Sequence, residues 1–489
     1  MSDPLLLIAL PLLGAFLLPP CARVSARLAR YIGPLWLVLA ALSGLRLWGG
    51  LETLLVVHVG GFAPPFGIDL YVDHLSLLFA LAVSLGALLL WPAVDGDRPR
   101  RAMLTLLLVA AGNGLALSGD LFNLYVFYEL VGVISFGLIA SAKTEAGDGA
   151  VFVATLRYLV VNALGAVSAL VGIALVYRLT GTLNLAQLAE LAPQRLAGAP
   201  GLAAFVLMLI GFGVKAELFP LNAWVPEVYA TAPARVSALL AGVVSKLALL
   251  VVVKLLVLVF DLPAARQLLV VLGIAGLLSG ELAAWRARDF RRMLAFSSIG
   301  QLGAILIAFA VPGAAGLFAG LVLALHHLLL KPALFLLAQS WRGALSDLAG
   351  AGRDSPWAGV LFVLLALSLI GVPPLPGFWA KLVALVALFG QGEPLYATGA
   401  AALMLGAVLE ANYLFRIVGR LRAAPSARPA PRPRASALWP AGLLTAMLLA
   451  SVWFIEPLAA GLQGIAAEAA DVSAYIARVH PLPLTEAGR

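Results

Sequence analysis

Charged residues and cysteine are both scarce in this chain. Only 11% of its 489 residues are Asp, Glu, Lys or Arg, whereas 62% are hydrophobic, and the mean hydropathy is +1.03. Soluble domains are about one quarter charged, so the composition excludes a soluble cytosolic enzyme. The single Cys21 excludes a disulfide framework, a four-cysteine zinc site and an iron–sulfur cluster held by this chain alone. Because the apolar residues gather in runs of roughly 20, the length that crosses a bilayer, we expect a polytopic helical membrane protein.

Motifs for bound cofactors and metals are missing as well. The glycines are scattered through apolar runs, where they commonly assist helix packing, and they form no phosphate-binding loop. His326 and His327 are adjacent on one run and cannot hold a haem iron from both sides. His58 and His74 are expected near the outer surface, and His480 lies in the tail. We therefore expect no cofactor, no metal, no nucleic-acid partner and no catalytic chemistry in this chain itself.

The basic residues divide by type. Only six of the 32 basic residues are lysine, and all of these except Lys143 lie inside apolar runs. A charge at the bilayer centre costs roughly 3 kcal/mol, so each buried lysine needs a reason. Lysine changes its protonation state readily on burial, whereas arginine effectively never does. We interpret the loop arginines as topology signals and the buried lysines as proton chemistry. The buried lysines are Lys215, Lys246, Lys254, Lys331 and Lys381.

The apolar runs predict an all-α fold with about 14 transmembrane helices. One pair of runs is separated only by Gly119 and Asp120, which we expect to form a tight hairpin. Arginines concentrate in alternate loops, and the positive-inside rule then places those loops in the cytoplasm. The same rule places both termini on the outer side of the cell inner (plasma) membrane.

Two of the predicted spans are interrupted by proline beside a lysine. Lys215 precedes Pro220 by five residues, and Pro374 and Pro376 come just before Lys381. Proline removes a helix hydrogen bond, and the freed carbonyls are tolerated only against protein or water. A packing kink would explain either span alone. Two broken helices that each carry a buried lysine instead favour a transport site between repeats.

Further ionisable residues lie deep in the predicted spans. Glu129 stands alone near the middle of its run and needs a cationic partner. Lys246 is similarly deep, and Lys254 lies about two turns nearer the outer end, where reaching to the surface is an equally good explanation. Groups that gain and lose a proton at bilayer depth are what a proton relay requires.

One run carries two histidines and a lysine. His327 and Lys331 are four residues apart and so share one helix face. His326 is turned by about 100° from His327, so one of the two histidines could simply bond to a neighbouring helix. Structural salt bridges would explain two or three of the buried ionisable residues, but they explain the whole set poorly.

Five segments resemble a known family of membrane proteins. They are GDLFNLYVFYE, KAELFPLNAWVPEVYATAPARVSALLAGVVSK, RDFRRMLAFSSIGQLG, HHLLLKPALFL and PLPGFWAK. In this order and spacing they are similar to the antiporter-like subunits of respiratory complex I, membrane-bound hydrogenases and Mrp-type Na+/H+ antiporters. DLFNLYVFYE and the short chain are most similar to the D-type subunit of the Mrp antiporters.

The resemblance implies a division of the chain. Three transmembrane helices would occupy 1–95, and two inverted five-helix repeats, each a proton half-channel, would occupy 102–260 and 265–416. A cytoplasmic linker, the last transmembrane helix and a tail would make up 417–489.

The resemblance also implies a proton path that begins with a pair between Glu129 and Lys215. Its members would be Glu129, Lys215, Lys246, His327, Lys331 and Lys381. The accessory candidates are His326, Lys254, Glu217, Glu410 and Glu281.

Three acids depart from the family pattern or call for another explanation. Glu217 occupies a site that is usually small and neutral in the family, and it lies roughly on the opposite helix face from Lys215. The other two are expected, most simply, to pair with arginines at the cytoplasmic ends: Glu281 with Arg286, and Glu410 with Arg416.

The leading hypothesis is a proton-translocating, antiporter-like subunit of a multisubunit membrane complex, of the Mrp cation (Na+)/H+ type. Its partners would be other membrane subunits, including further antiporter-like ones, with protons and Na+ as the transported ions. The first alternative is a pumping subunit of a redox-driven complex, which would make the assembly an enzyme. The second is a structural membrane scaffold whose polar residues only hold helices together.

Overall fold

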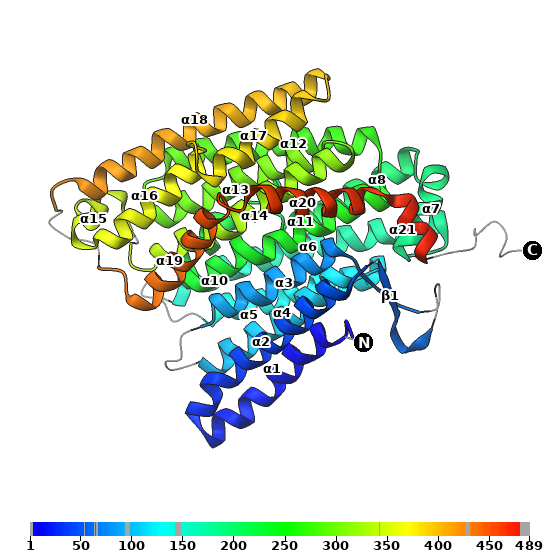
Figure 1. Cartoon of the computed structure of the whole chain (residues 1–489), viewed down its shortest axis with the longest axis horizontal. Coiled ribbons are helices and arrows are strands. Elements are labelled where there is room, and N and C mark those ends of the chain that lie inside the picture. The colour runs from blue at the N-terminus through cyan, green and yellow to red at the C-terminus, as the bar shows by residue number, and fades with distance from the viewer. Residues whose placement is uncertain are drawn as a thin grey trace, which may run out of the picture.

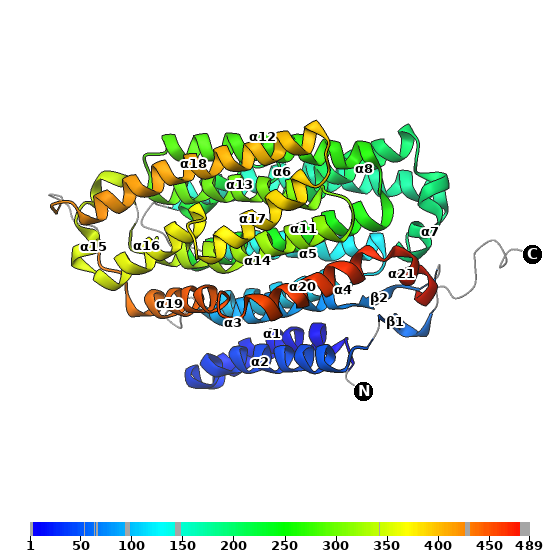
Figure 2. The same ribbon diagram turned by 45° about the horizontal axis from the view of Figure 1, so that its top comes forward.

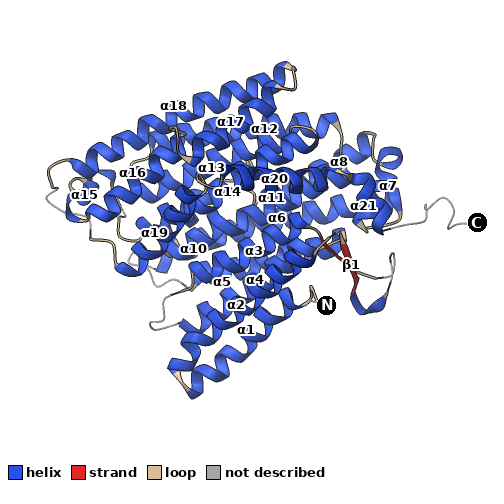
Figure 3. Ribbon diagram, in the orientation of Figure 1, coloured by secondary structure: helices blue, strands red, loops and turns tan. Residues whose placement is uncertain are grey.

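The structure is a computed structural model that describes residues 3–52, 54–62, 64, 67–92, 98–141, 148–341, 343–425 and 431–479. Within these residues the chain is a bundle of helices, with one two-stranded β-hairpin at one end (Figure 1, Figure 3). Lys143 and His480 lie outside the described residues.

The N-terminal part contains three long helices and the hairpin. Ser25 caps the second helix by accepting from the Leu28 N–H, and Asp73 caps the third by accepting from the Ser76 N–H at 2.6 Å. The elements are α1 (Leu6–Val24), α2 (Ala26–Gly50), β1 (Leu55–His58), η1 (Val59–Gly61), β2 (Asp69–Val72) and α3 (His74–Leu89). The strands are antiparallel, with Leu55 opposite Val72.

The next part contains the first broken helix. Its elements are α4 (Arg98–Leu117), α5 (Leu121–Ala140), α6 (Asp148–Thr180), α7 (Leu185–Arg195), α8 (Ala199–Gly213), α9 (Val225–Thr231), α10 (Ala234–Leu239), η2 (Leu240–Val244), α11 (Ser245–Lys254) and η3 (Leu255–Val259). The tight connection expected at Gly119 and Asp120 is confirmed, because Asp120 caps α5 by accepting from two backbone N–H groups. Elements α10 to η3 form one continuous, deeply buried span in which two π-helical stretches flank α11.

The second broken helix follows. Its neighbours are α12 (Pro263–Arg286), α13 (Phe290–Phe309), α14 (Gly313–Leu337), η4 (Leu345–Leu348), α15 (Ala351–Asp354), α16 (Pro356–Ile370), α17 (Pro376–Phe389) and α18 (Pro394–Arg422). Helices α12 and α13 approach so closely that a Cβ added to Gly280 would lie 2.5 Å from the Gly300 nitrogen. Small residues allow such contact between membrane helices.

The C-terminal segment lies across the bundle. Its helices are α19 (Ala435–Ala450), α20 (Ile455–Ala470) and α21 (Val472–Val479). A bend of 87° separates α19 from α20, after which α20 packs on α14 and α3, and α21 reaches α7 (Figure 2). The start of α1 and α21 lie on the side of the bundle that carries the hairpin, and the α1–α2 turn and the end of α18 lie on the opposite side.

Among the described residues, ten helices are long and apolar enough to span a membrane, and the bent pair α19–α20 makes eleven. The shorter apolar helices are α3, α8, α16 and α17. The interruptions lie where proline predicted them, since α8 ends at Gly213 before Pro220 and α17 begins at Pro376. The fold is therefore a polytopic helical membrane protein.

Candidate functional site

The first buried ion pair forms where α5, α6 and the end of α8 meet. Lys215 Nζ lies 3.6 Å from Glu129 Oε1 and donates to Asn162 Oδ1 at 2.5 Å. The Asn162 amide in turn donates to Glu129 Oε2 at 3.1 Å. The Lys215 side chain is almost fully buried, whereas 25% of the Glu129 side chain is exposed. The pair predicted from the sequence is thus present, and an amide bridges it.

Tyr128 supports the break in the helix at Lys215. Its hydroxyl lies 2.9 Å from the Phe212 carbonyl oxygen, which the interrupted helix leaves free, and it accepts from the Lys215 backbone N–H at 3.2 Å. The Lys215 ammonium lies 3.6 Å from the centre of the Tyr128 ring, which adds a cation–π contact. Gly132 leaves the space for Lys215, because an added Cβ would lie 2.9 Å from Nζ.

Glu217 points away from this pair, as expected from its position two residues after Lys215. It has a φ of +54°, a left-handed conformation that costs roughly 1–3 kcal/mol for a residue other than glycine. Tyr229 donates its hydroxyl to Glu217 Oε1 at 2.6 Å, and the Ser298 side chain also interacts with the carboxylate. The carboxylate interacts electrostatically with Lys246 and Lys331. Glu217 therefore faces the next group of ionisable residues.

Lys246 and His327 meet in the interior of the bundle, between α11 and α14. A hydrogen bond links Lys246 Nζ on α11 to His327 Nδ1 on α14. Lys246 also donates to the Ala241 carbonyl at 2.6 Å, in the π-helical stretch just before α11. On its other side, His327 Nε2 lies 3.4 Å from the Ser298 hydroxyl.

Lys331 continues the line through two hydroxyl groups. Its Nζ donates to Ser297 Oγ at 2.7 Å, and Ser297 is hydrogen-bonded to the Tyr413 hydroxyl at 2.8 Å. Tyr413 is also hydrogen-bonded to Glu281 Oε2 at 3.0 Å. Glu281 is fully buried, and its Oε1 has no hydrogen-bond partner among the described residues.

The last pair belongs to the second broken helix. Lys381 Nζ lies 2.5 Å from Glu410 Oε2 and donates to the Ile370 carbonyl at the end of α16 at 3.2 Å. The Gln301 amide donates to Glu410 Oε1. The expected pairing of Glu410 with Arg416 is wrong, because Glu410 is fully buried and the Arg416 guanidinium donates to the Trp285 carbonyl.

The pairing expected for Glu281 with Arg286 is also wrong. The two are five residues apart on α12, but Glu281 faces the bundle interior and Tyr413, whereas Arg286 lines a surface cavity with Arg416. Burial against α18, which the sequence does not reveal, decides which way the carboxylate points.

Two accessory candidates lie beside the line rather than on it. His326 is hydrogen-bonded to the Ser368 hydroxyl on α16 at 3.0 Å, whereas His327 bonds to Lys246 on α11, so both histidines bond to neighbouring helices. Lys254 is buried and donates to the carbonyls of Ala116 and Ser118 at 2.6 and 3.2 Å. Reaching to the surface is therefore the wrong explanation for Lys254.

Several uncharged members of the line were not predicted. Their side chains form hydrogen bonds with the charged groups. In the sequence they can be noticed only as amide or hydroxyl residues within apolar runs. They are Asn162, Ser297, Ser298, Gln301, Tyr229 and Tyr413.

Comparisons with known proteins agree with the geometry. The family model described as NADH:quinone oxidoreductase/Mrp antiporter, TM, matches residues 118–406. NADH-quinone oxidoreductase subunit N of Desulforudis audaxviator is 33% identical over 440 residues, 85% of each chain. The D-type subunit of the Na(+)/H(+) antiporter of Alkalihalophilus pseudofirmus is 31% identical over 365 residues, 72% of this chain and 73% of that one.

A solved structure shows the same fold. A chain in the structure of the Mrp complex from Dietzia sp. DQ12-45-1b superposes with a TM-score of 0.90 at 27% identity, covering 98% of this chain and 99% of that one. The resemblance inferred from the five motifs is confirmed, and the chain belongs to the NADH:quinone oxidoreductase/Mrp antiporter transmembrane family.

Proposed function

We propose that this chain is a proton-translocating, antiporter-like subunit of a multisubunit membrane complex, most simply a cation (Na+)/H+ antiporter of the Mrp type. The observation that carries the proposal is the line of ionisable groups, buried except for the partly exposed Glu129, that runs from α5 to Glu410 on α18. Isolated buried charges are costly in a membrane. A series of them that crosses the bundle is best explained by a transported charge.

The Glu129–Lys215 pair is the proposed switch. A carboxylate next to a buried ammonium favours its protonated form, and withdrawing the carboxylate favours release of the proton. Glu129 is partly exposed and Lys215 is not, so a partner subunit that moves α5 would act on the carboxylate. Asn162, which bonds to both groups, would then hold Lys215 in place while Glu129 moves.

Glu217 is the proposed link between the switch and the centre. It is two residues from Lys215, yet its carboxylate interacts with Lys246 and Lys331. Strained backbone conformations such as that of Glu217 cluster at functional sites in proteins. A proton released by Lys215 would reach Lys246 and His327 through Glu217 and intervening water.

The second half would carry the proton from His327 to Lys381. Each hydroxyl donates one hydrogen, so Lys331, Ser297, Tyr413 and Glu281 can form a directed chain of donors. The exit would be the Lys381–Glu410 pair at the second broken helix.

The proposed membrane arrangement has 14 spans in the plasma membrane, with the broken pair α16–α17 counted as one span. Two inverted repeats would occupy 102–260 and 265–416, each with a broken helix and a lysine at or beside the break. The hairpin side, with both termini, would face outward, and the other membrane subunits, including further antiporter-like ones, would pack beside the bundle.

The test is ion exchange in inverted vesicles that contain the whole complex, followed with a pH-sensitive dye. Lys215→Ala and Glu129→Ala are expected to abolish exchange while the complex still assembles, as judged by native gel electrophoresis. Unchanged exchange in both variants would contradict the proposal.

A redox-driven pump is the second candidate. It is favoured by the 33% identity to a protein named NADH-quinone oxidoreductase subunit N. The buried line would work in the same way, but electron transfer in partner subunits would drive it. Flavin or iron–sulfur absorbance in the purified native complex would favour the pump, and a colourless complex that exchanges Na+ for protons would favour the antiporter. A scaffold predicts instead that lysine substitutions destabilise the complex without a separate transport defect.

A further inference from the structure

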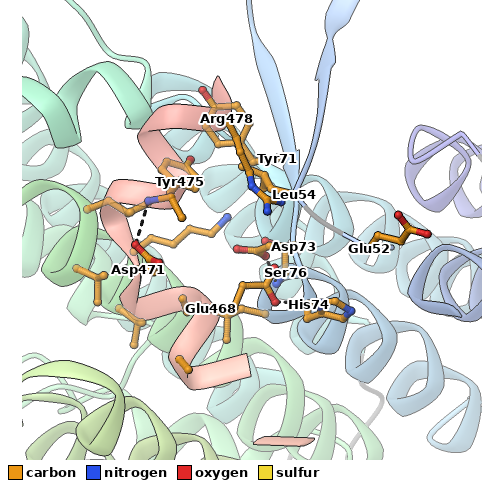
Figure 4. A pocket seen from close by; sticks show the side chains of 18 residues that line it. Glu52, Leu54, Tyr71, Asp73, His74, Ser76, Glu468, Asp471, Tyr475 and Arg478 are labelled. Atoms are coloured by element: carbon orange, nitrogen blue, oxygen red, sulfur yellow. Dashed lines mark hydrogen bonds and ion pairs between the residues drawn. The ribbon is translucent and has the colours of Figure 1, made fainter. Parts of the chain in front are cut away.

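A cavity of about 420 Å3 lies beside the hairpin, apart from the line between Glu129 and Glu410 (Figure 4). We call it the hairpin cavity. Its polar lining comes from the start of α3, the end of α11 and the C-terminal segment. The lining residues used below are Asp73, His74, Lys254, Glu468 and Asp471.

Lys254 connects this cavity to the interior of the bundle. It is 7% exposed, and its ammonium donates to two carbonyls near the end of α4, at Ala116 and Ser118. An ammonium has three hydrogens to donate, and the described residues provide acceptors for two. Within the described part of the chain, Asp73 is the carboxylate with a marked electrostatic effect on Lys254. A buried charge thus borders the cavity without a carboxylate in direct contact among the described residues.

The C-terminal segment closes the cavity on the side away from α3. Glu468 on α20 lies 2.7 Å from His74 Nδ1, which joins the segment to the start of α3 (Figure 4). The ring of Tyr475 on α21 packs edge-on against Tyr71, with centroids 5.2 Å apart. These contacts join α20 and α21 to the α3 and hairpin side, so the segment forms a wall of the cavity.

Two narrow voids continue from the cavity toward Lys246. The first shares Leu75, Val253 and Ala469 with the hairpin cavity, and the second is lined by Lys246. The two voids share Phe79 and Leu321.

Both voids are dry. Their volumes are about 0 and 10 Å3, and a water molecule needs roughly 10–15 Å3 together with polar partners. We call this stretch the apolar neck, formed mainly by Leu75, Phe79, Leu250, Val253 and Leu321. Lys246 and Lys254 are eight residues apart on one helix, a rise of about 12 Å, so the neck spans about that length.

We propose that the hairpin cavity is a proton port on the outer side and that the apolar neck is its gate. The proposal rests on the proposed function. Apolar constrictions in membrane proteins close by losing water, and a proton crosses such a distance only along bridging water. When waters enter the neck, Lys246 gains access to the outer aqueous phase near the first broken helix, independently of Lys381.

Lys254 gains one proton for each proton that it loses. The Lys254 ammonium releases its proton to water in the cavity or to the Asp73 carboxylate, and its neutral amine then takes up the proton that Lys246 passes along the waters of the neck. Glu52, Glu468 and Asp471 add negative charge to the lining, which Arg478 offsets only in part, and the remaining negative charge attracts cations.

The first test compares two substitutions of Lys254 in the complete complex, reconstituted in vesicles. Lys254→Met removes the charge, whereas Lys254→Arg keeps the charge and a long stem but cannot release a proton. Both are expected to lower exchange more than tenfold with assembly intact, and Glu456→Gln, an exposed change on α20, is the control. Full exchange in Lys254→Arg would overturn the port, because it would show that only the positive charge is needed.

The second test uses the single native cysteine. In a Cys21→Ser background, Ala474→Cys places a thiol in the wall of the hairpin cavity, and Gly461→Cys places one on an open face of α20. A membrane-impermeant thiosulfonate added on the hairpin side is expected to lower exchange at least fivefold at position 474 and not at 461. Equal exchange before and after labelling at 474 would overturn the port even if the Lys254 variants fail to assemble.

Lys215→Ala, measured in parallel, separates the two proposals. Loss of exchange in Lys215→Ala with normal exchange in both Lys254 variants would remove the port and leave the proposed function standing. Normal exchange in all three would remove both.

Discussion

Lys381 Nζ lies 2.5 Å from Glu410 Oε2, although the two residues are 29 positions apart and belong to different helices. The contact between Lys215, at the other broken helix, and Glu129 is 3.6 Å and is bridged by Asn162. In this structure the second pair is closed directly, and the first is held through an amide. The two broken helices therefore present their lysines to carboxylates in different ways.

Breaking the closed pair is expected to destabilise the protein. Glu410→Ala leaves the Lys381 ammonium buried without its carboxylate, and removing one partner of a buried pair typically costs roughly 3–5 kcal/mol. Lys381→Met combined with Glu410→Ala is expected to recover most of that loss. Thermal unfolding of the purified complex in detergent measures both. A double variant as unstable as Glu410→Ala alone would show that the pair is not the source.

Asn162 is expected to matter for transport more than an uncharged residue usually does. Asn162→Ala removes the acceptor 2.5 Å from Lys215 Nζ, and hydrogen bonds to charged groups are worth about 1.5–3 kcal/mol. We expect exchange to fall roughly tenfold or more, since 1.4 kcal/mol corresponds to a factor of ten. Ser168→Ala, on an exposed face of the same helix, is the control. Equal exchange in the two variants would exclude a bridging role for Asn162.

The absence of a side chain at Gly132 leaves room for Lys215, and this gives a steric prediction. Gly132→Ala places a methyl group 2.9 Å from Lys215 Nζ, which pushes the ammonium away from Asn162 and lowers exchange. Gly419→Ala is the matched control, because an added Cβ there meets nothing within 4 Å and alanine favours a helix by roughly 0.5–1 kcal/mol. The vesicle assay checks both variants, and normal exchange in Gly132→Ala would show that Lys215 tolerates displacement.

Glu217 has a strained backbone conformation and a proposed role in proton transfer. Substitutions can separate the effects of the two. Glu217→Gly relieves the positive φ and is expected to raise thermal stability, whereas exchange is expected to fall because the linking carboxylate is lost. Glu217→Gln keeps an acceptor for the Tyr229 hydroxyl, but an amide cannot take up and release a proton, so exchange should also fall. If Glu217→Gln exchanges normally, Glu217 is a structural residue of the helix break.

The sequence was informative wherever the energetic cost of a residue can be judged from its neighbours along the chain. Lysines inside apolar runs are costly, and all five proved to be buried. Prolines next to Lys215 and Lys381 predicted interrupted helices, and the interruptions lie there. The family followed from motifs around these same residues.

The sequence was misleading about the direction in which a side chain points from its helix. Glu281 and Glu410 were assigned to nearby arginines because neighbours along a helix are the only partners that a sequence displays. In the fold both carboxylates turn toward α18 or α17 and away from the surface. Lys254, expected to reach the surface as readily as to stay inside, is instead held by carbonyls at the end of α4.

By itself, the sequence determined the class of protein, the positions of the helix breaks and the burial of the five lysines, because burial cost, chain-breaking residues and span length are local properties. Only the tertiary structure decided which charges meet. Asn162 joins Glu129 to Lys215, and Tyr413 joins Glu281 to Ser297, through contacts between helices far apart in the chain. The partner of a buried charge depends on how helices rotate and pack against one another, and hydrophobic spans reveal length and depth but not rotation.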